Sequence, residues 1–336
     1  MAWRSKLTPA VADARRSVRE ALERHGVVEG DWLLVACSGG PDSVALASAV
    51  VFEGPKLGLR LAAVIVEHGI QPQTKQVAVE TKELLERIGF ELVEVVPVEV
   101  GSEGGLEAAA RSARYQAIDE VAAKIDAKYV LLGHTLNDQA ETVLLGLARG
   151  SGSRSLSGMA ELTGRYLRPF LQLTRETTVQ VCEDSELATW TDPHNNDESF
   201  SRVRVRKNLL PQMESELGPG IVEALARTAD QLREDSDQLD LEAEIAFRGH
   251  VSSGATSVSF PVGALVEMPL AIRYRVIRMA ASALGGHIHR SHVLEIDRLL
   301  TNWHGQKPLT VPSVRVERTG EQIVFKSTKT LRPGAC

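Results

Sequence analysis

The sequence predicts an α/β protein with a Rossmann-like parallel sheet and a smaller, mostly helical C-terminal domain. Short apolar stretches alternate with helix-like stretches between residues 32 and 147, an order typical of a parallel sheet covered on both faces. A Gly-rich turn at 38–43 follows the first apolar stretch, and ligands of such sheets bind beyond the carboxyl ends of the strands.

The elements of the first domain follow from capping residues and apolar spacing. A helix should begin at Thr8-Pro9 and end at Gly26, because a capping residue and a terminal glycine bracket its apolar face. The expected strands cover residues 32–37, 61–66, 92–98 and 129–132. The expected helices cover residues 44–52, 77–88, 107–125 and 139–147.

The second half of the chain has a different pattern. Gly, Ser and Arg are concentrated at 149–159, which predicts a surface loop, and a turn-rich stretch covers 192–197. A long acidic helix should run from 219 to about 246, with further helix after 269 and a hairpin at 311–325. We therefore predict two domains, residues 1–216 and 217–336.

Charge is unevenly distributed along the chain. The net charge of −6 does not by itself favour nucleic-acid binding, and 4% aromatic residues are few for a protein that stacks RNA bases. However, Arg149 to Arg175 carries five arginines against one acid, and Arg202 to Lys207 is a basic run. A local basic face can bind phosphate while another face stays acidic.

The cysteines and the N-terminus indicate the cellular compartment of the protein. Cys37, Cys182 and Cys336 form no C-x-x-C pair, which disfavours a zinc, iron–sulfur or dithiol site. The N-terminus lacks an apolar signal core, and no apolar run approaches the roughly 20 residues of a membrane helix. We expect a soluble cytoplasmic protein without a membrane partner.

The Gly-rich turn has the features of a phosphate site. Its glycines let backbone N–H groups approach an anion, the following helix adds partial positive charge, and two serines can donate hydrogen bonds. Its aspartate would repel phosphate unless Mg²⁺ lay between them. A simple capped turn is the alternative, but the strand before and the helix after favour the phosphate site. The residues are Ser38, Gly39, Gly40, Pro41, Asp42 and Ser43.

A second polar segment follows the strand that ends near Leu132. His134, Asp138 and Glu141 lie where ligands of such a sheet bind. Asp138 and Glu141 are three residues apart and share a helical face, so the pair can hold Mg²⁺ or an ammonium group. A helix-capping role for the same residues is compatible with this one.

These segments, in this order, resemble the tRNA(Ile)-lysidine synthetases of the PP-loop ATP pyrophosphatase superfamily. The resemblance covers residues 30 to 215 approximately and is weak beyond 250. It rests on S-G-G-P-D-S at 38–43, V-E-H-G-I at 66–70, L-E-A-A-A-R-x-x-R-Y at 106–115, G-H-T-L-N-D-Q-A-E-T at 133–142, R-G-S-G at 149–152, S-G-M at 157–159, R-P-F-L at 168–171, and the block from Asp192 to Pro211.

Three positions depart from the pattern of the family. Asn137 stands where an aspartate is usual, so Asp138 and Glu141 must carry more of the negative charge. Glu67 replaces an aspartate, and His194 replaces a common serine.

The resemblance implies ATP-dependent ligation of L-lysine to C2 of the wobble cytidine of tRNA(Ile) with a CAU anticodon. An adenylated RNA is the implied intermediate, and the products are lysidine, AMP and pyrophosphate. Codon specificity would change from AUG to AUA. The implied cofactors are ATP and Mg²⁺, and the C-terminal domain would bind tRNA. A homodimer is left open.

The resemblance also assigns roles to residues. It implies that ATP binds residues 38–43 and His68, that Asp42 and Asp138 hold Mg²⁺, and that lysine binds Glu107, Asp138 and Glu141. Asp42, His134, Asp138 and Arg206 are the implied catalytic residues, and either His134 or Asp138 could accept the proton of lysine. The implied tRNA-binding residues are Arg111, Arg114, Arg202, Arg204 and Arg206.

Three alternatives remain open on the sequence. A tRNA-base thiolase of the same superfamily would commonly need paired cysteines, which this chain lacks. A small-molecule amidating enzyme would usually carry a glutaminase partner. A non-catalytic tRNA-binding homologue is kept open by Asn137.

The alternating Arg202, Arg204 and Arg206 would share one face of a strand but would scatter around a helix.

Overall fold

The computed structural model describes residues 6–67, 74–98, 106–150 and 152–328. The chain divides into two compact units, Met1–Leu232 and Arg233–Cys336, and the division falls inside the long helix α10 (Ile221–His250). The two units are described separately below.

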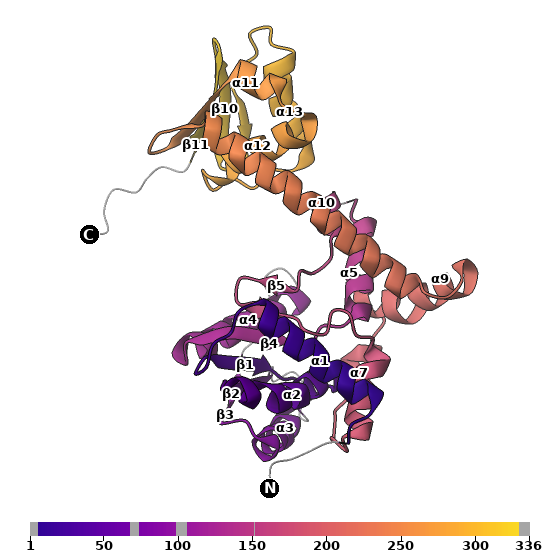
Figure 1. The fold of residues 1–336 in the computed structure, drawn as a ribbon. Coiled ribbons are helices and arrows are strands. Elements are labelled where there is room, and N and C mark those ends of the chain that lie inside the picture. The colour runs from indigo at the N-terminus through magenta and orange to yellow at the C-terminus, as the bar shows by residue number, and fades with distance from the viewer. Residues whose placement is uncertain (1–5, 68–73, 99–105, 151, 329–336) are drawn as a thin grey trace. The chain divides into compact units, whose positions relative to one another are not determined.

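A six-stranded sheet forms the centre of the first unit, with the order β3-β2-β1-β4-β6-β5 (Figure 1). Every neighbouring pair is parallel except the short antiparallel pair β5 and β6. The predicted parallel α/β fold is confirmed. The strands are β1 (Trp32–Ala36), β2 (Arg60–Glu67), β3 (Leu92–Pro97), β4 (Ala127–Leu132), β5 (Leu162–Thr163) and β6 (Tyr166–Leu167).

Helices cover both faces of this sheet, so alternate residues of β1 enter two different cores. Leu33 and Val35 pack with α1 (Pro9–Arg24), α2 (Pro41–Glu53), α3 (Thr74–Ile88) and α7 (Arg175–Asp184). Leu34 packs on the other face with α4 (Leu106–Lys124). Burial on both faces explains why the strands are apolar throughout rather than alternating.

Two predicted helices begin about one turn earlier than their apolar patterns. α2 begins at Pro41, where proline at the first helical position needs no N–H partner. α5 (Leu136–Ala148) begins after Thr135, which forms a capping box with Asp138. Both early turns are polar, so apolar periodicity could not detect them, and both carry candidate site residues.

The segment after α5 is more helical than expected. The predicted loop at 149–159 contains α6 (Ser153–Leu156), and the turn at 192–197 contains the 3₁₀ helix η2 (Pro193–Asn196). The arginine run lies on α8 (Ser201–Arg204) and η3 (Val205–Leu209), a π-helical turn, followed by α9 (Leu210–Leu217). Another 3₁₀ turn, η1 (Gly54–Leu57), follows α2.

The second unit packs helices on a five-stranded antiparallel sheet of order β7-β8-β11-β10-β9. The hairpin of β10 and β11 confirms the predicted hairpin, whereas the other strands were not expected in a mostly helical domain. Phe260 and Phe325 are fully buried in its core. The elements are β7 (Ser252–Ser253), β8 (Ser257–Pro261), α11 (Val262–Glu267), α12 (Leu270–Ser282), α13 (Arg290–Thr301), β9 (Leu309–Val311), β10 (Val314–Thr319) and β11 (Gln322–Ser327).

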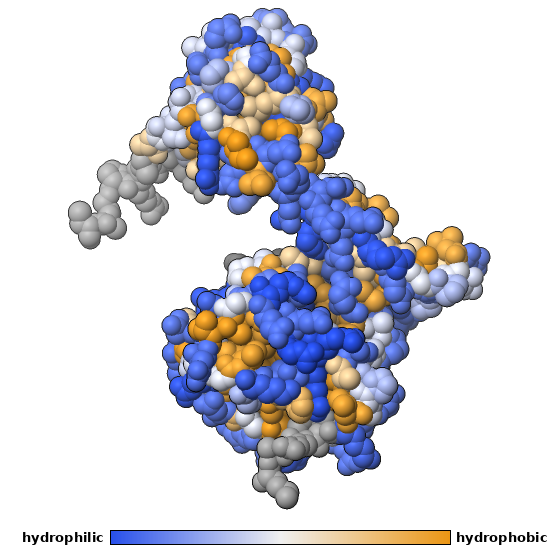
Figure 2. All heavy atoms as spheres, in the orientation of Figure 1, coloured by the Kyte–Doolittle hydropathy of each residue, from blue (hydrophilic) through white to orange (hydrophobic). Residues whose placement is uncertain are grey.

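The surface of α10 is hydrophilic along the side seen in Figure 2, in keeping with its acidic sequence.

Within the described ranges, no helix is both long and apolar enough to span a membrane.

Gly133 brings the end of β4 against the start of α2. A Cβ at Gly133 would lie 2.8 Å from the Asp42 carbonyl oxygen and 3.1 Å from the Ser43 Cα. Both neighbours are backbone atoms, which cannot rotate away. Glycine at this position therefore allows the polar segment after β4 to lie beside the Gly-rich turn.

Gly133→Ala should destabilise the first unit by roughly 1–3 kcal/mol, because the added methyl forces a backbone shift. Urea denaturation measures the change. Gly152→Ala is the matched control, since a Cβ there meets no atom within 4 Å and the backbone has φ −69°. An equal midpoint for Gly133→Ala and the wild type would contradict the tight contact.

Candidate active site

The Gly-rich turn joins β1 to α2 and is held by backbone contacts. Gly39 has φ +81°, and a Cβ there would lie 2.6 Å from Thr81 Oγ1. The Gly39 carbonyl accepts a 2.9 Å hydrogen bond from the Trp190 backbone N–H. The left-handed conformation and the close approach of Thr81 both require glycine at this position.

The two serines of the turn have different surroundings. The buried Ser43 hydroxyl donates to the Gly40 carbonyl at 2.9 Å and accepts from the Ser38 backbone N–H at 3.1 Å. Ser38 is exposed. The hydroxyl of Ser43 therefore fixes the shape of the turn, while Ser38 lies at the surface beside the N-terminus of α2, which favours anions. His68 lies outside the described residues.

Asp42 lies in the first turn of α2 and faces α7. Its Oδ1 accepts a hydrogen bond from the Thr178 hydroxyl, and its Oδ2 lies 3.5 Å from Arg175 Nε. Burial raises the pKa of Asp42, and the attraction of Arg175 and the Thr178 hydrogen bond only partly oppose this.

Asp138 caps helix α5 with one carboxylate oxygen and contacts arginines with the other. Its Oδ2 accepts from the Thr135 backbone N–H at 2.9 Å and completes the capping box of α5. Its Oδ1 lies 3.1 Å from Arg175 Nη2 and 3.7 Å from Arg206 Nη2. Burial alone would raise the pKa of Asp138, but Arg175, His134 and the Thr135 N–H together hold it below its usual value.

Glu141 is fully buried and contacts three arginines. Arg206 binds it through two hydrogen bonds, Nε–Oε1 at 2.6 Å and Nη2–Oε2 at 3.1 Å. Arg202 Nε lies 3.3 Å from Oε2, and Arg175 Nη1 lies 3.5 Å from Oε1. Asp42, Asp138 and Glu141, called the carboxylate cluster below, thus lie close enough for one guanidinium to contact all three.

Arg175 is the central residue that the sequence analysis did not single out. It is the first residue of α7, and it contacts each member of the carboxylate cluster. Its only signal in the sequence is its position at the end of an arginine-rich segment, because nothing local relates residue 175 to residues 42 and 138.

Asn137 has a structural contact that accounts for a polar residue there. Its side-chain Oδ1 accepts a 2.8 Å hydrogen bond from the Arg175 backbone N–H, which has no acceptor within its own helix. A neutral amide serves this contact as well as a carboxylate does. Asn137 therefore positions the start of α7.

His134 follows β4 and is held neutral. Burial lowers its pKa to about 4, and the nearby Arg168, Arg202 and Arg114 add to this effect against the attraction of Asp138. Among the described residues, His134 Nδ1 has no hydrogen-bond partner. At pH 7 this imidazole is an uncharged group with one free ring nitrogen.

The remaining predicted arginines differ in whether they contact the carboxylate cluster. Arg202 and Arg206 lie four residues apart on a helical run and both reach Glu141. Arg114 has its pKa lowered by burial and by the charges of Arg111 and Arg202. Exposed Arg111 lies over the Tyr115 ring, 4.9 Å from its centroid. The side chain of Glu107 lies outside the described residues.

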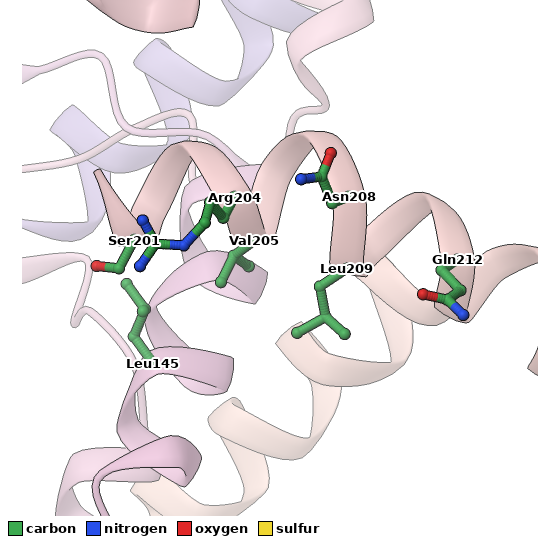
Figure 3. A pocket seen from close by; sticks show the side chains of 7 residues that line it. All are labelled: Leu145, Ser201, Arg204, Val205, Asn208, Leu209 and Gln212. Carbon is green, nitrogen blue, oxygen red and sulfur yellow. The ribbon is translucent and has the colours of Figure 1, made fainter. Parts of the chain in front are cut away.

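Arg204 points away from the carboxylate cluster. It donates to the carbonyls of Glu198 and Ser199 at 2.6 and 2.8 Å. It also lines an open pocket of about 360 Å³ with residues of α5, η3 and α9 (Figure 3). The helical run therefore places Arg204 apart from Arg202 and Arg206, which settles the geometry that the sequence left open.

The carboxylate cluster suits a hard cation that brings other ligands with it. In the described part of the chain, no group of three or more His, Cys, Asp or Glu is arranged as a metal site. Asp42 and Asp138 supply two carboxylates, and Mg²⁺ is commonly bound by one or two carboxylates together with substrate phosphates. The residues present therefore fit Mg²⁺ bound along with a phosphate ligand.

Comparison with known proteins identifies the family. A model described as a PP-loop domain matches residues 12–213, and one described as a TilS substrate binding domain matches residues 260–322. A tRNA(Ile)-lysidine synthase from Thermobifida fusca is 49% identical over 322 residues, covering 95% of this chain and 98% of that protein. The chain belongs to the tRNA(Ile)-lysidine synthase family. The resemblance seen in the sequence is confirmed.

Other similar proteins agree with this placement. A tRNA(Ile)-lysidine synthase from Streptomyces coelicolor is 48% identical over 308 residues, covering 90% of this chain and 87% of that protein. The solved U34-tRNA thiolase NcsA from Methanococcus maripaludis has a TM-score of 0.56 at 18% identity, covering 67% of this chain and 80% of that one. This last likeness shows the shared fold alone.

Gln139, in the first turn of α5, holds the S-G-M block at 157–159 through two hydrogen bonds. Gln139 donates to the Met159 carbonyl at 2.8 Å and accepts from the Met159 N–H at 2.6 Å. The S-G-M block is thus fixed to the first turn of α5.

The pKa of His134 predicts a pH dependence of stability. Its folded pKa of about 4 lies below the ordinary 6.5, so the neutral form stabilises the fold above pH 6.5, and this contribution is lost as the pH falls toward 4. Urea denaturation at pH 7 and pH 4.5 should show a smaller loss of stability in His134→Gln than in the wild type. Equal losses would contradict the lowered pKa.

Asn137→Ala should cost about 1 kcal/mol of stability, because the Arg175 N–H loses its acceptor. Asn137→Asp should keep the stability, since a carboxylate also accepts that bond and favours a helix N-terminus. Thermal unfolding of both variants measures the difference. Equal stability of Asn137→Ala and the wild type would show that the contact contributes nothing.

Proposed function

We propose that this enzyme uses ATP to ligate L-lysine to C2 of the wobble cytidine of tRNA(Ile) with a CAU anticodon, in the cytoplasm. The reaction gives lysidine, AMP and pyrophosphate through an adenylated RNA. The modified anticodon would read AUA in place of AUG.

The carboxylate cluster beside the Gly-rich turn carries this proposal. Three carboxylates converge there, and each already contacts a guanidinium. The reaction brings two cationic ligands to the site, a metal ion with ATP and lysine, whose amino groups are protonated before it reacts. A buried anionic cluster next to a phosphate-binding helix N-terminus offers partners to both.

In the first step, the C2 oxygen of cytosine attacks the α-phosphate and pyrophosphate leaves. The backbone N–H groups of residues 38–43 and the Ser38 hydroxyl bind phosphate oxygens. Asp42 and Asp138 hold Mg²⁺, which when bound neutralises phosphate charge. Arg206 stabilises the charge that develops on the α-phosphate.

In the second step, the ε-nitrogen of lysine forms a bond to C2, and the C2–O bond breaks with AMP as leaving group. Splitting the displacement into two steps lowers each barrier. Glu141 and Asp138 hold the cationic ends of lysine, with Glu107 as a further candidate. Either His134 or Asp138 accepts the proton of lysine: Nδ1 of His134 has no hydrogen-bond partner among the described residues but its lowered pKa makes it a weak base, whereas both oxygens of Asp138 have partners.

The RNA is bound by arginines around this centre and by the second unit. Arg202 contacts Glu141 and Arg114 lies near Arg202, whereas Arg111 and Arg204 are exposed and suited to backbone phosphates. The segment 260–322, whose matching model is described as substrate binding, is the part of the second unit that we assign to tRNA.

A thiolase activity is disfavoured by the two cysteines that the structure describes. Cys37 and Cys182 are both buried. Burial raises the pKa of Cys37, and burial together with Asp42 raises the pKa of Cys182 to about 12. Both therefore stay protonated, which suits neither sulfur transfer nor cluster ligation.

Incorporation of labelled L-lysine into tRNA tests the proposal. We expect ATP-dependent incorporation into tRNA(Ile) with a wobble cytidine and none when that base is uridine. Pyrophosphate release without lysine would point to another nucleophile. Binding of tRNA without either product would favour a non-catalytic homologue.

Asp42→Asn should lower tRNA-dependent pyrophosphate release by about a thousand-fold, since one of two metal-binding carboxylates is lost at a step governed by charge stabilisation. Asp13→Asn, at an exposed position of α1, is the matched control and should keep wild-type release. Activity of Asp42→Asn within tenfold of the wild type would remove Asp42 from the metal site.

A further inference from the structure

Arg175 differs from the other arginines of the site in how many carboxylates it reaches. It lies 3.5 Å from Asp42, 3.1 Å from Asp138 and 3.5 Å from Glu141. By contrast, Arg206 contacts Asp138 and Glu141, and Arg202 contacts Glu141. The guanidinium of Arg175 therefore occupies the shared centre of the carboxylate cluster.

The charge preference of a helix N-terminus does not explain an arginine at this position. Arg175 is the first residue of α7, where the partial positive charge of the helix N-terminus disfavours a cation. Its placement is explained instead by the carboxylates that it faces.

Both the backbone and the side chain of Arg175 are fixed. The Asn137 side chain accepts its N–H, and the next residue, Asp138, binds its guanidinium. The hydroxyl of Thr178, one turn later, has one hydrogen to donate and lies within hydrogen-bond distance of both Asp42 and the Arg175 carbonyl. The first turn of α7 is thus tied to the first turns of both α2 and α5.

A cation at this centre has two consequences. It stabilises the charged forms of three neighbouring carboxylates, two buried and one partly buried, which would otherwise repel one another. It also competes with a further cation at this centre, because the guanidinium already fills the space between the three carboxylates and its charge repels another positive group. Phosphate is the natural alternative partner for a guanidinium, since both prefer paired hydrogen bonds.

We propose that Arg175 is a positioning residue that fills the cation site of the carboxylate cluster and must leave it before the metal or the lysine ammonium group can bind. This inference rests on the proposed function, in which Asp42 and Asp138 hold the metal. Metal alone then binds weakly, and ATP opens the site by offering its phosphates to Arg175.

Binding of Mn²⁺ alone, measured by electron paramagnetic resonance without ATP or tRNA, tests this directly. Arg175→Gln should bind Mn²⁺ at least tenfold more tightly than the wild type. Arg202→Gln is the matched control, because it removes the same charge from the cluster but contacts only Glu141 among the three carboxylates. It should change the affinity by less than threefold.

Two results would overturn the inference: no gain of affinity in Arg175→Gln, or an equal gain in Arg202→Gln. Adding Asp42→Asn to Arg175→Gln should abolish the gain, which locates the metal. Should Arg175→Gln not fold, Arg175→Lys decides, because a lysine point charge cannot span three carboxylates. Affinity of Arg175→Lys above the wild type supports the inference, and unchanged affinity contradicts it.

These measurements separate the inference from the proposed function. Wild-type lysine incorporation with no Mn²⁺ gain in Arg175→Gln would refute the inference alone. A gain that depends on Asp42, together with no lysine incorporation by the wild type, would refute the proposed reaction and leave the role of Arg175 standing.

Discussion

The contact between the carboxylate cluster and its arginines is the interaction on which the site depends. Three partly or fully buried acids would be unstable as charges without cations, and the guanidiniums of Arg175 and Arg206 supply them. The acids come from the first turn of α2 and the first two turns of α5, and the arginines come from α7 and from the helical run at 201–209. This one network therefore joins four segments that lie far apart in the sequence.

The backbone makes this convergence possible. β1 and β4 are neighbours in the sheet, so the turns after them open at the same edge. Gly133 lets those turns touch, and the Gly39 conformation turns the chain toward α2. The π-helical turn η3 adds a distortion close to Arg206, and such turns occur often at functional sites. The scaffold thus brings a phosphate-binding helix N-terminus and an acidic cluster to the same place.

Much of the fold followed from the sequence, because strands buried on both faces and capped helices leave strong local patterns. The turn at 38–43 and the pair Asp138 and Glu141 could be proposed as site residues for the same reason, since each lies within one short segment. Arg175 was missed because its partners are remote, and only the folded chain relates it to Asp42. The strands β5 and β6 were missed because two residues carry no periodicity. Asn137 looked like a lost charge until its bond to the Arg175 N–H explained it.

If the carboxylate cluster binds incoming cations in turn, a crystal structure with Mg²⁺ and a non-hydrolysable ATP analogue should show the exchange. We expect a metal ion bound to Asp42 and Asp138, with the guanidinium of Arg175 moved from the carboxylates to phosphate oxygens. Nucleotide bound at the Gly-rich turn with Arg175 still on all three carboxylates, and no metal between Asp42 and Asp138, would contradict it.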